Sequence, residues 1–239
     1  MQNFLNSLVF GIYPYVALVV LIIGTIVRYD REPYTWRSGS SQLLRRKQLV
    51  WGSVLFHLGV LLIFAGHVVG LLTPIVLFDA LGVSHGAKQL LAIVAGGVAG
   101  AMGIVGATLL VHRRLFDARV RAASSASDTL IIVLLWIQLA LGLLTIPVSM
   151  QHLDGHEMVK FMNWAQGIFT FDPEASGYVA DAAPVFKLHL FLGLTILLVF
   201  PFTRLVHMLS APVRYLWRPG YQVVRQKPSR AASVRLPAE

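Results

Sequence analysis

Four histidines lie in long apolar stretches of the sequence, where an imidazole is costly. His57 and His67 belong to one stretch, and His189 and His207 belong to another. Ionisable side chains inside a membrane mark functional sites by default. Neutral imidazole is also a common ligand of haem iron and of other metals. These four residues are therefore the candidate site.

The chain contains no cysteine. Disulfides, thiolate-bound iron–sulfur clusters and haem attached through a C-x-x-C-H motif are therefore excluded. A redox cofactor of this chain must be held without thiolate, and histidine is the available ligand.

The composition indicates lipid as the solvent of these histidines. Of 239 residues, 56% are hydrophobic and 13% are charged, against about 25% charged in a soluble domain. Four stretches without formal charge each exceed the roughly 20 residues that cross a hydrocarbon core. They are residues 1–27, 48–78, 89–112 and 129–153. No basic region precedes the first, so we expect a retained span and not a cleaved signal.

A fifth stretch, residues 188–203, is shorter between charges. Arg204 can snorkel to the interface, so we expect a helix over about residues 185–209. The fold class is therefore all-α with five transmembrane helices, because only helices satisfy their own backbone in lipid. Pro14 suits the start of the first span, Pro74 and Pro147 suit the ends of the second and fourth, and Pro201 predicts a kink in the fifth.

Basic residues predict the orientation. All but three of the 20 lysines and arginines lie between spans one and two, between spans three and four, or after span five. The exceptions are Lys88, Lys160 and Lys187. By the positive-inside rule the N-terminus is outside and the C-terminus is cytoplasmic. The net charge of +9 thus reflects topology, and we expect no nucleic-acid partner.

This orientation pairs the histidines by depth. Span two runs outward and span five runs inward, so His67 matches His189 near the outside and His57 matches His207 near the cytoplasm. Each pair can ligate one haem axially between the two helices. Along ideal helices the two histidines of span two are about 15 Å apart and those of span five about 27 Å. Positions 18 apart share a face, whereas positions 10 apart differ by about 80°.

Other interpretations stay open on these residues alone. Four membrane histidines also suit a proton relay, a metal transporter or structural hydrogen bonds. A transporter predicts broken helices, repeats and midplane acids, and no span core contains Asp or Glu. Small residues beside the histidines, Gly66 and Gly193, suit haem clearance or plain helix packing. Packing is favoured for the glycines of span three at positions 96, 97, 100, 103 and 106.

Short motifs spread along the chain resemble those of one known family. The matching segments are residues 12–15, 28–30, 34–37, 56–59, 66–67, 70–74, 88–89, 113–116, 143–147, 151–155, 188–190, 201–202 and 204–207. In this order and spacing the chain resembles the cytochrome b (gamma) subunit of membrane-bound respiratory nitrate reductase. The resemblance extends from near the N-terminus to about residue 225, and the four histidines all fit it.

The resemblance implies a multi-pass subunit in a bacterial or archaeal cell membrane with two b-type haems. His67 and His189 would bind the outer haem, and His57 and His207 the inner one. Quinol, the substrate, would be oxidised near Lys88 and Gly66. A cytoplasmic iron–sulfur subunit and a molybdenum catalytic subunit would be the partners. A related di-haem subunit of another reductase and a haem-free transporter are the alternatives.

Lys88 is also notable by its position alone. It lies at the outer start of span three, where the helix dipole disfavours a cation. A donor there can hydrogen-bond a quinone oxygen and favour negative charge on the departing quinol. A snorkelling interfacial lysine is the other interpretation.

Three further segments complete the predicted organisation. In the outer loop, residues 155–169 are expected to form a short interfacial helix, with Trp164 at headgroup level. Residues 1–210 form the di-haem domain, and residues 211–239 form a cytoplasmic tail. Arg37, Arg113 and Arg114 are candidates for haem propionate contacts on the inner side, and topology signals are the favoured interpretation of these residues.

Overall fold

The structure is a computed structural model that describes residues 2–36, 44–210 and 217. The chain divides into a unit of Met1–Met208, which contains all the histidines, and a second unit of Leu209–Glu239. Most of the expected tail, 211–239, and the candidate Arg37 lie outside the described residues.

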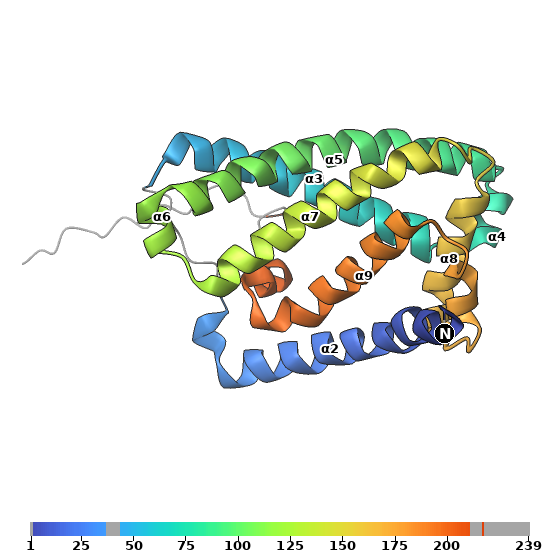
Figure 1. Cartoon of the computed structure of the whole chain (residues 1–239), viewed down its shortest axis with the longest axis horizontal. Helices are drawn as coiled ribbons and strands as arrows, with labels where there is room; N and C mark the ends of the chain where they lie inside the picture. Colours follow the sequence, from blue (N-terminus) through green and yellow to red (C-terminus); the bar gives the residue numbers. More distant parts are fainter. Residues whose placement is uncertain (1, 37–43, 211–216, 218–239) are drawn as a thin grey trace, which may run out of the picture. The chain divides into compact units, whose positions relative to one another are not determined.

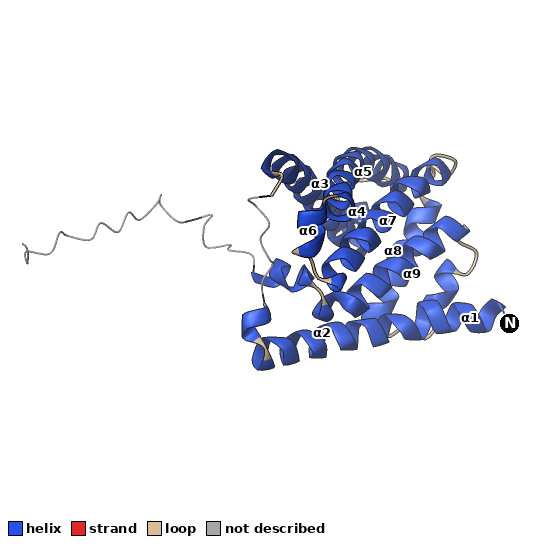
Figure 2. Cartoon of the chain, turned by 60° about the vertical axis from the view of Figure 1, so that its left-hand side comes forward, coloured by secondary structure: helices blue, strands red, loops and turns tan. Residues whose placement is uncertain are grey.

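Every regular element in the described part of the first unit is helical (Figure 2). In chain order, the N-terminal elements are α1 (Gln2–Ser7), the π-helical turn η1 (Leu8–Ile12), α2 (Tyr13–Arg31) and the 3₁₀ turn η2 (Pro33–Thr35). The middle elements are α3 (Arg46–Leu72), α4 (Ile75–Ala80), α5 (His85–Phe116), α6 (Ala118–Ala122) and α7 (Ala126–Ser149). The last are α8 (His156–Thr170), η3 (Ala175–Val179), α9 (Pro184–Val199), η4 (Phe200–Phe202) and η5 (Arg204–Ser210), the three η elements being 3₁₀ turns.

Five helical segments are long and apolar enough to cross a membrane, which confirms that part of the prediction. They are Phe4–Arg31, Arg46–Leu72, His85–Phe116, Ala126–Ser149 and Pro184–Phe202. Side-chain oxygens cap two of the long helices: Ser84 accepts a hydrogen bond from Ala87 at the start of α5, and Ser125 accepts one from Asp128 at the start of α7. Such caps satisfy backbone donors that a helix leaves free.

Small residues set the close contacts of α5 with α3 and α7. The helices pack in the order α3 on α5, α5 on α7, α7 on α9 and α9 on α2 (Figure 1). A Cβ on Gly59 of α3 would lie 2.5 Å from the backbone nitrogen of Gly103 on α5. A Cβ on Gly100 would lie 2.7 Å from the Leu143 side chain of α7. Gly100, Gly103 and Gly106 of span three therefore serve close helix packing, as favoured from the sequence. Gly96 does not, because a Cβ there would meet nothing within 4 Å.

The fifth span is shorter than predicted. The α-helix ends at Val199, Phe200–Phe202 form a 3₁₀ turn, and Thr203 is extended at φ −120° and ψ 176°. Pro201 has no N–H to donate and its ring obstructs the preceding turn, so it ends this helix instead of kinking it. His207 thus lies on η5 and not on a continuous helix with His189. The estimate of about 27 Å between them, and the shared helix face, do not apply.

Trp164, which was expected at headgroup level, is buried in the core of the protein. Its exposed fraction is 7%, and its indole N–H donates to the carbonyl oxygen of Phe10 at 2.9 Å. That carbonyl needs a partner, because Pro14, four residues on, has no N–H. The helix expected over residues 155–169 does form as α8. It lies against α3, where the amide of Gln166 donates to the carbonyls of Leu71 and Thr73.

Candidate functional site

The structure brings the inner histidines together. His57 on α3 and His207 on η5 have ring centres 6.4 Å apart, with the ring planes inclined by 69°. The Nδ1 of His57 is 2.7 Å from the carbonyl oxygen of Ser53, one turn earlier on α3. The Nδ1 of His207 is 2.5 Å from the carbonyl oxygen of Arg204. Both rings are therefore oriented by backbone carbonyls of their own elements.

The outer histidines also face each other. His67 on α3 and His189 on α9 have ring centres 6.2 Å apart, with an interplanar angle of 41°. The Nδ1 of His67 is 2.8 Å from the carbonyl oxygen of Ile63. For His189, the amide nitrogen of Gln138 on α7 lies 3.4 Å from ring Nε2 and 3.1 Å from the backbone carbonyl.

Each of the four rings keeps one nitrogen that no protein group in the described part of the chain uses. In His57, His67 and His207 an Nδ1–H that donates to a carbonyl leaves the Nε2 lone pair available. Such second-shell hydrogen bonds fix the tautomer of metal-binding histidines. In His189 the buried Nδ1 has no hydrogen-bond partner, so one nitrogen of this ring is also available to a ligand.

The spacing of each pair fits one shared metal. Two metal–imidazole bonds of about 2 Å, added to the distance from each nitrogen to its ring centre, place the ring centres roughly 6 Å apart. The observed values are 6.4 Å and 6.2 Å. Groups of three or more metal-binding side chains are absent from the described residues. Paired imidazoles without a third ligand suit the two axial positions of a haem iron.

Glycines beside the outer pair leave open space on α3 but not on α7 or α9. Helices that follow one another in the packing order are in close contact, whereas α3 and α9 are not closely packed on each other. A Cβ on Gly66 or Gly70 would meet nothing within 4 Å, and one on Gly142 of α7 would lie 3.1 Å from the His189 ring. Gly193 is different, because its Cβ would lie 3.2 Å from the Gln138 amide. The donors and their spacing thus fit two haems between α3 and the α9–η5 segment.

Lys88 is buried and does not snorkel. It lies at the start of α5 with an exposed fraction of 6%. Its Nζ has no hydrogen-bond partner and lies 4.5 Å from the ring centre of Phe78 on α4. An aromatic face attracts a cation but does not replace the hydrogen bonds that an ammonium makes in water. The ammonium of Lys88 is therefore available to donate a hydrogen bond to an acceptor atom of a ligand.

The predicted inner arginines have protein partners. Arg113 donates to the carbonyl of Leu44 at 2.6 Å. Arg114 and Arg204 both lie beside Asp128, at 3.5 Å and 3.6 Å. Since Asp128 lies in the first turn of α7 and Arg204 begins η5, the element that carries His207, this cluster ties the two elements together.

The remaining histidines lie outside the two pairs. His112 is 3.2 Å from the amide nitrogen of Gln48, and His152 Nδ1 is 3.1 Å from the carbonyl of Val148. His156 lies 3.9 Å from Asp154. His85 is 3.2 Å from Asp79.

An ion cluster links α8 to the segment between η3 and α9. Lys160 donates to Glu157 at 2.8 Å and to Asp181 at 2.9 Å. The hydrogen bonds to Glu157 and Asp181 raise the pKa of Lys160 above its ordinary value. The hydrogen bond from Lys160 lowers the pKa of Asp181. Both shifts favour the charged forms of Lys160 and Asp181 at neutral pH.

Two residues of the candidate site were not predicted from the sequence. Gln138 is a polar residue in the middle of an apolar span, which is the signal that sequence reasoning passed over. Phe78 carries no such signal, because its role depends on α4 folding back beside α5. The sequence shows neither where a chain turns nor which ring will lie under a lysine.

Fold and site together define a class: a multi-pass helical membrane protein with two histidine pairs, each joining α3 to the α9–η5 segment. A comparison with family profiles matches residues 6–227 to the family described as nitrate reductase gamma subunit. The chain therefore belongs to the nitrate reductase gamma subunit family, as the sequence motifs predict.

Three relatives align with this chain over all or nearly all of their length. The respiratory nitrate reductase 1 gamma chain of Escherichia coli (strain K12) is 50% identical over 226 residues, which are 95% of this chain and 100% of that protein. The respiratory nitrate reductase 2 gamma chain of the same strain is 48% identical over 227 residues, with 95% and 100% coverage. The nitrate reductase gamma chain of Bacillus subtilis (strain 168) is 37% identical over 223 residues, with 93% and 99% coverage.

Proposed function

We propose that this chain is the di-haem cytochrome b subunit of a respiratory nitrate reductase, and that it oxidises quinol near its outer face. The observation that carries the proposal is the presence of two facing histidine pairs at spacings of 6.4 Å and 6.2 Å. The relatives bear the name of nitrate reductase gamma chains, which favours this enzyme over another reductase.

The four histidines are the proposed axial ligands. His67 and His189 hold the outer haem, and His57 and His207 hold the inner one. When bound, the haems would supply one-electron chemistry. The chain holds each ring at a fixed orientation through Ser53, Ile63 and Arg204 carbonyls and the Gln138 amide. Pre-set rings lower the cost of reorganisation when electrons arrive and leave.

Quinol is the proposed substrate at Lys88 and Gly66. An oxygen of the quinol would satisfy the buried ammonium of Lys88, and the positive charge favours the anion that remains when a proton leaves. Open space beside Gly66 adjoins His67, so a ring bound there lies next to the outer pair. Two electrons and two protons must leave each quinol that becomes quinone.

Orientation determines where these products go. With the N-terminus outside and the C-terminus in the cytoplasm, protons leave on the outer side and electrons leave at the inner pair. The basic segments between the spans then offer a docking surface for a cytoplasmic iron–sulfur subunit, which passes electrons to a molybdenum subunit. Charge separated in this way builds a proton-motive force.

Quinol-driven haem reduction tests the proposal. The complex, with this chain expressed beside its partner subunits, is mixed with reduced quinol without oxygen, and the visible spectrum is followed. We expect the parent and Lys160→Met to be reduced at similar rates, and Lys88→Ala to be slower by about tenfold or more because one charge-assisted hydrogen bond is lost. A parent whose haem responds to dithionite but not to quinol would contradict the proposal.

A further inference from the structure

We infer that His85, oriented by Asp79, is the group that accepts the protons released by quinol. The inference rests on the proposed function, since it concerns the same outer site. It arises because the structure brings α4 and the start of α5 together around the buried Lys88.

The geometry links these residues at two neighbouring points. His85 and Lys88 are three residues apart on α5 and therefore lie on the same side of the helix. Phe78 and Asp79 are consecutive on α4. Lys88 Nζ lies 4.5 Å from the ring centre of Phe78, and His85 Nε2 lies 3.2 Å from Asp79 Oδ1. The imidazole is thus held within one helical turn of the proposed quinol-binding ammonium.

The chemistry requires a base beside the ammonium. Conversion of a quinol to a quinone breaks two O–H bonds and releases two electrons and two protons. The haem that His67 and His189 would hold would supply the one-electron acceptor. A lysine ammonium is already protonated, so it stabilises an oxygen anion but takes no proton. Histidine is the side chain whose ordinary pKa, about 6.5, suits uptake and release of protons near neutrality.

The partner of His85 favours this role. When His85 Nε2–H donates to the Asp79 carboxylate, the lone pair of Nδ1 is the acceptor, and the carboxylate stabilises the imidazolium that forms. The His85 and Asp79 side chains are 39% and 53% exposed, so each proton can pass on to outer water before the second arrives. His85 is therefore assigned as a catalytic residue and Asp79 as a positioning residue.

Other groups on the outer side are less suited to accept the quinol protons. Lys160, Glu157 and Asp181 satisfy one another. The ionisable groups around His85 include Asp79 on α4, Lys88 on its own helix, and Asp154 and His156, which flank Gly155. A Cβ on Gly155 would lie 2.5 Å from the His85 carbonyl carbon, so this loop packs on the backbone of His85. Asp154 and His156 pair with each other at 3.9 Å.

The test compares His85→Gln with Asp79→Asn, and His156→Gln serves as the exposed outer-side control. Quinol-driven haem reduction is followed by stopped flow in the intact complex between about pH 5 and pH 8. Affinity for an unreactive hydroxyquinoline analogue of quinol is titrated separately. Reduction by dithionite reports whether each variant holds its haem.

In His85→Gln we expect quinol-driven reduction to fall by about tenfold or more and to lose its pH inflection, with analogue affinity within about threefold of the parent. Asp79→Asn should also slow quinol-driven reduction, but by less than His85→Gln and with the pH inflection kept, because the base remains and only its orienting carboxylate is lost. His156→Gln should match the parent. A His85→Gln profile equal to the parent overturns the inference and leaves the proposed function standing. A parent that quinol does not reduce overturns both.

Discussion

At the scale of single residues, orientation is the main contribution of this chain to its histidines. Three imidazoles donate Nδ1–H to a carbonyl three or four residues earlier, so the helix that carries each ring also sets its tautomer. His189 relies instead on Gln138 from a neighbouring helix. A substitution of Gln138 can therefore disturb the outer pair without removing a ligand.

Gln138→Leu should weaken the outer site. The substitution keeps the volume of the side chain but removes the amide beside His189, and loss of a second-shell partner typically costs about 10- to 100-fold in metal affinity. We expect the purified variant to lose its outer haem first in a detergent wash, as measured by pyridine haemochrome. Thr145→Val, one to two turns further along α7, is the control. Equal retention of haem in Gln138→Leu and the parent would show that the amide is dispensable.

The ion cluster on α8 predicts a pH-dependent stability. Asp181 has a lowered pKa, so its contribution is present above the unfolded value of about 3.9 and is lost as the pH falls through the folded value. Lys160 has a raised pKa, so its contribution is present below about 10.4 and is lost as the pH rises through the folded value.

Lys160→Met should therefore lower the melting temperature slightly at neutral pH, with a cost below about 1 kcal/mol because the cluster is partly exposed. Below about pH 4 the difference from the parent should shrink, as Asp181 becomes protonated. Thermal unfolding monitored by circular dichroism in detergent measures both. A constant difference across this range would mean that packing of the lysine stem, and not its charge, is what matters.

At the scale of helices, α3 and α5 are held by backbone contact. Gly59→Ala would place its Cβ 2.5 Å from Gly103 N and 2.6 Å from the carbonyl oxygen of Ala99. Backbone atoms cannot yield as a side chain does, so we expect a loss of roughly 1–3 kcal/mol or more. Because α3 carries His57 and His67, haem content should fall as well.

Gly96→Ala is the matched control for this contact. It lies on α5, and its Cβ would meet nothing within 4 Å. There alanine should be neutral or stabilising by up to about 1 kcal/mol, since glycine is a poor helix former. Thermal stability in detergent, measured side by side, distinguishes the two. Similar losses in both variants would refute the specific contact.

Helix positions were largely predictable from the sequence, whereas helix ends were less so. Charge-free stretches of the required length give the five spans because lipid excludes charge. The fifth span could not be delimited, because the same charge-free stretch allows Pro201 either to kink a helix or to end it. The burial of Trp164 was missed because it depends on a hydrogen bond to the carbonyl of Phe10. Pro14 leaves that carbonyl without a helical donor, and both residues lie far from Trp164 in the sequence.

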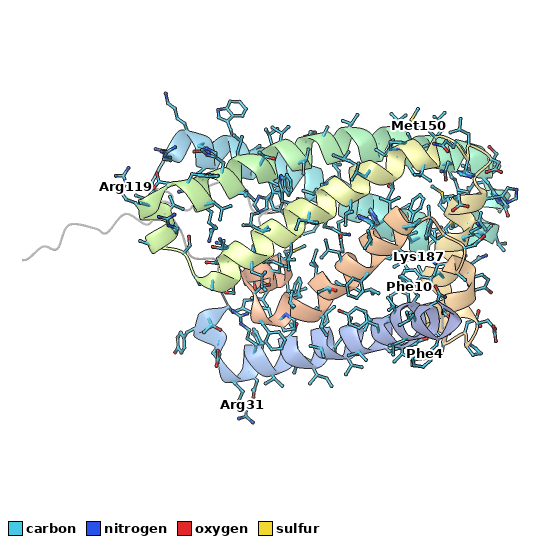
Figure 3. The ribbon with its side chains drawn as sticks, in the orientation of Figure 1. Phe4, Phe10, Arg31, Arg119, Met150 and Lys187 are labelled. Atoms are coloured by element: carbon cyan, nitrogen blue, oxygen red, sulfur yellow. The ribbon has the colours of Figure 1, made fainter. Side chains whose placement is uncertain are left out.

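At the scale of the whole bundle, the histidine pairing was predictable from topology. Antiparallel spans place residues of equal depth side by side, and the structure brings His57 beside His207 and His67 beside His189. The quinol side was only partly predictable: Lys88 could be named, but its contact with Phe78 depends on how α4 folds. Arg31 and Arg119 lie at one end of the bundle and Met150 at the opposite end (Figure 3).

The absence of cysteine makes the orientation directly measurable. Ser124→Cys lies between α6 and α7 on the predicted cytoplasmic side, and Asp154→Cys lies before α8 on the predicted outer side. A thiol reagent that cannot cross the membrane should label Asp154→Cys in intact cells and Ser124→Cys only after permeabilisation. The reverse pattern would invert the orientation and place the quinol site in the inner leaflet.

Haem stoichiometry tests the central claim most directly. Pyridine haemochrome is measured on the parent, on His57→Ala and on His67→Ala, with His112→Ala as a control outside both pairs. The account predicts two b-type haems per chain in the parent and in His112→Ala, and one in each of the other two variants. A folded parent without haem, or ligand variants that keep both haems, would contradict it.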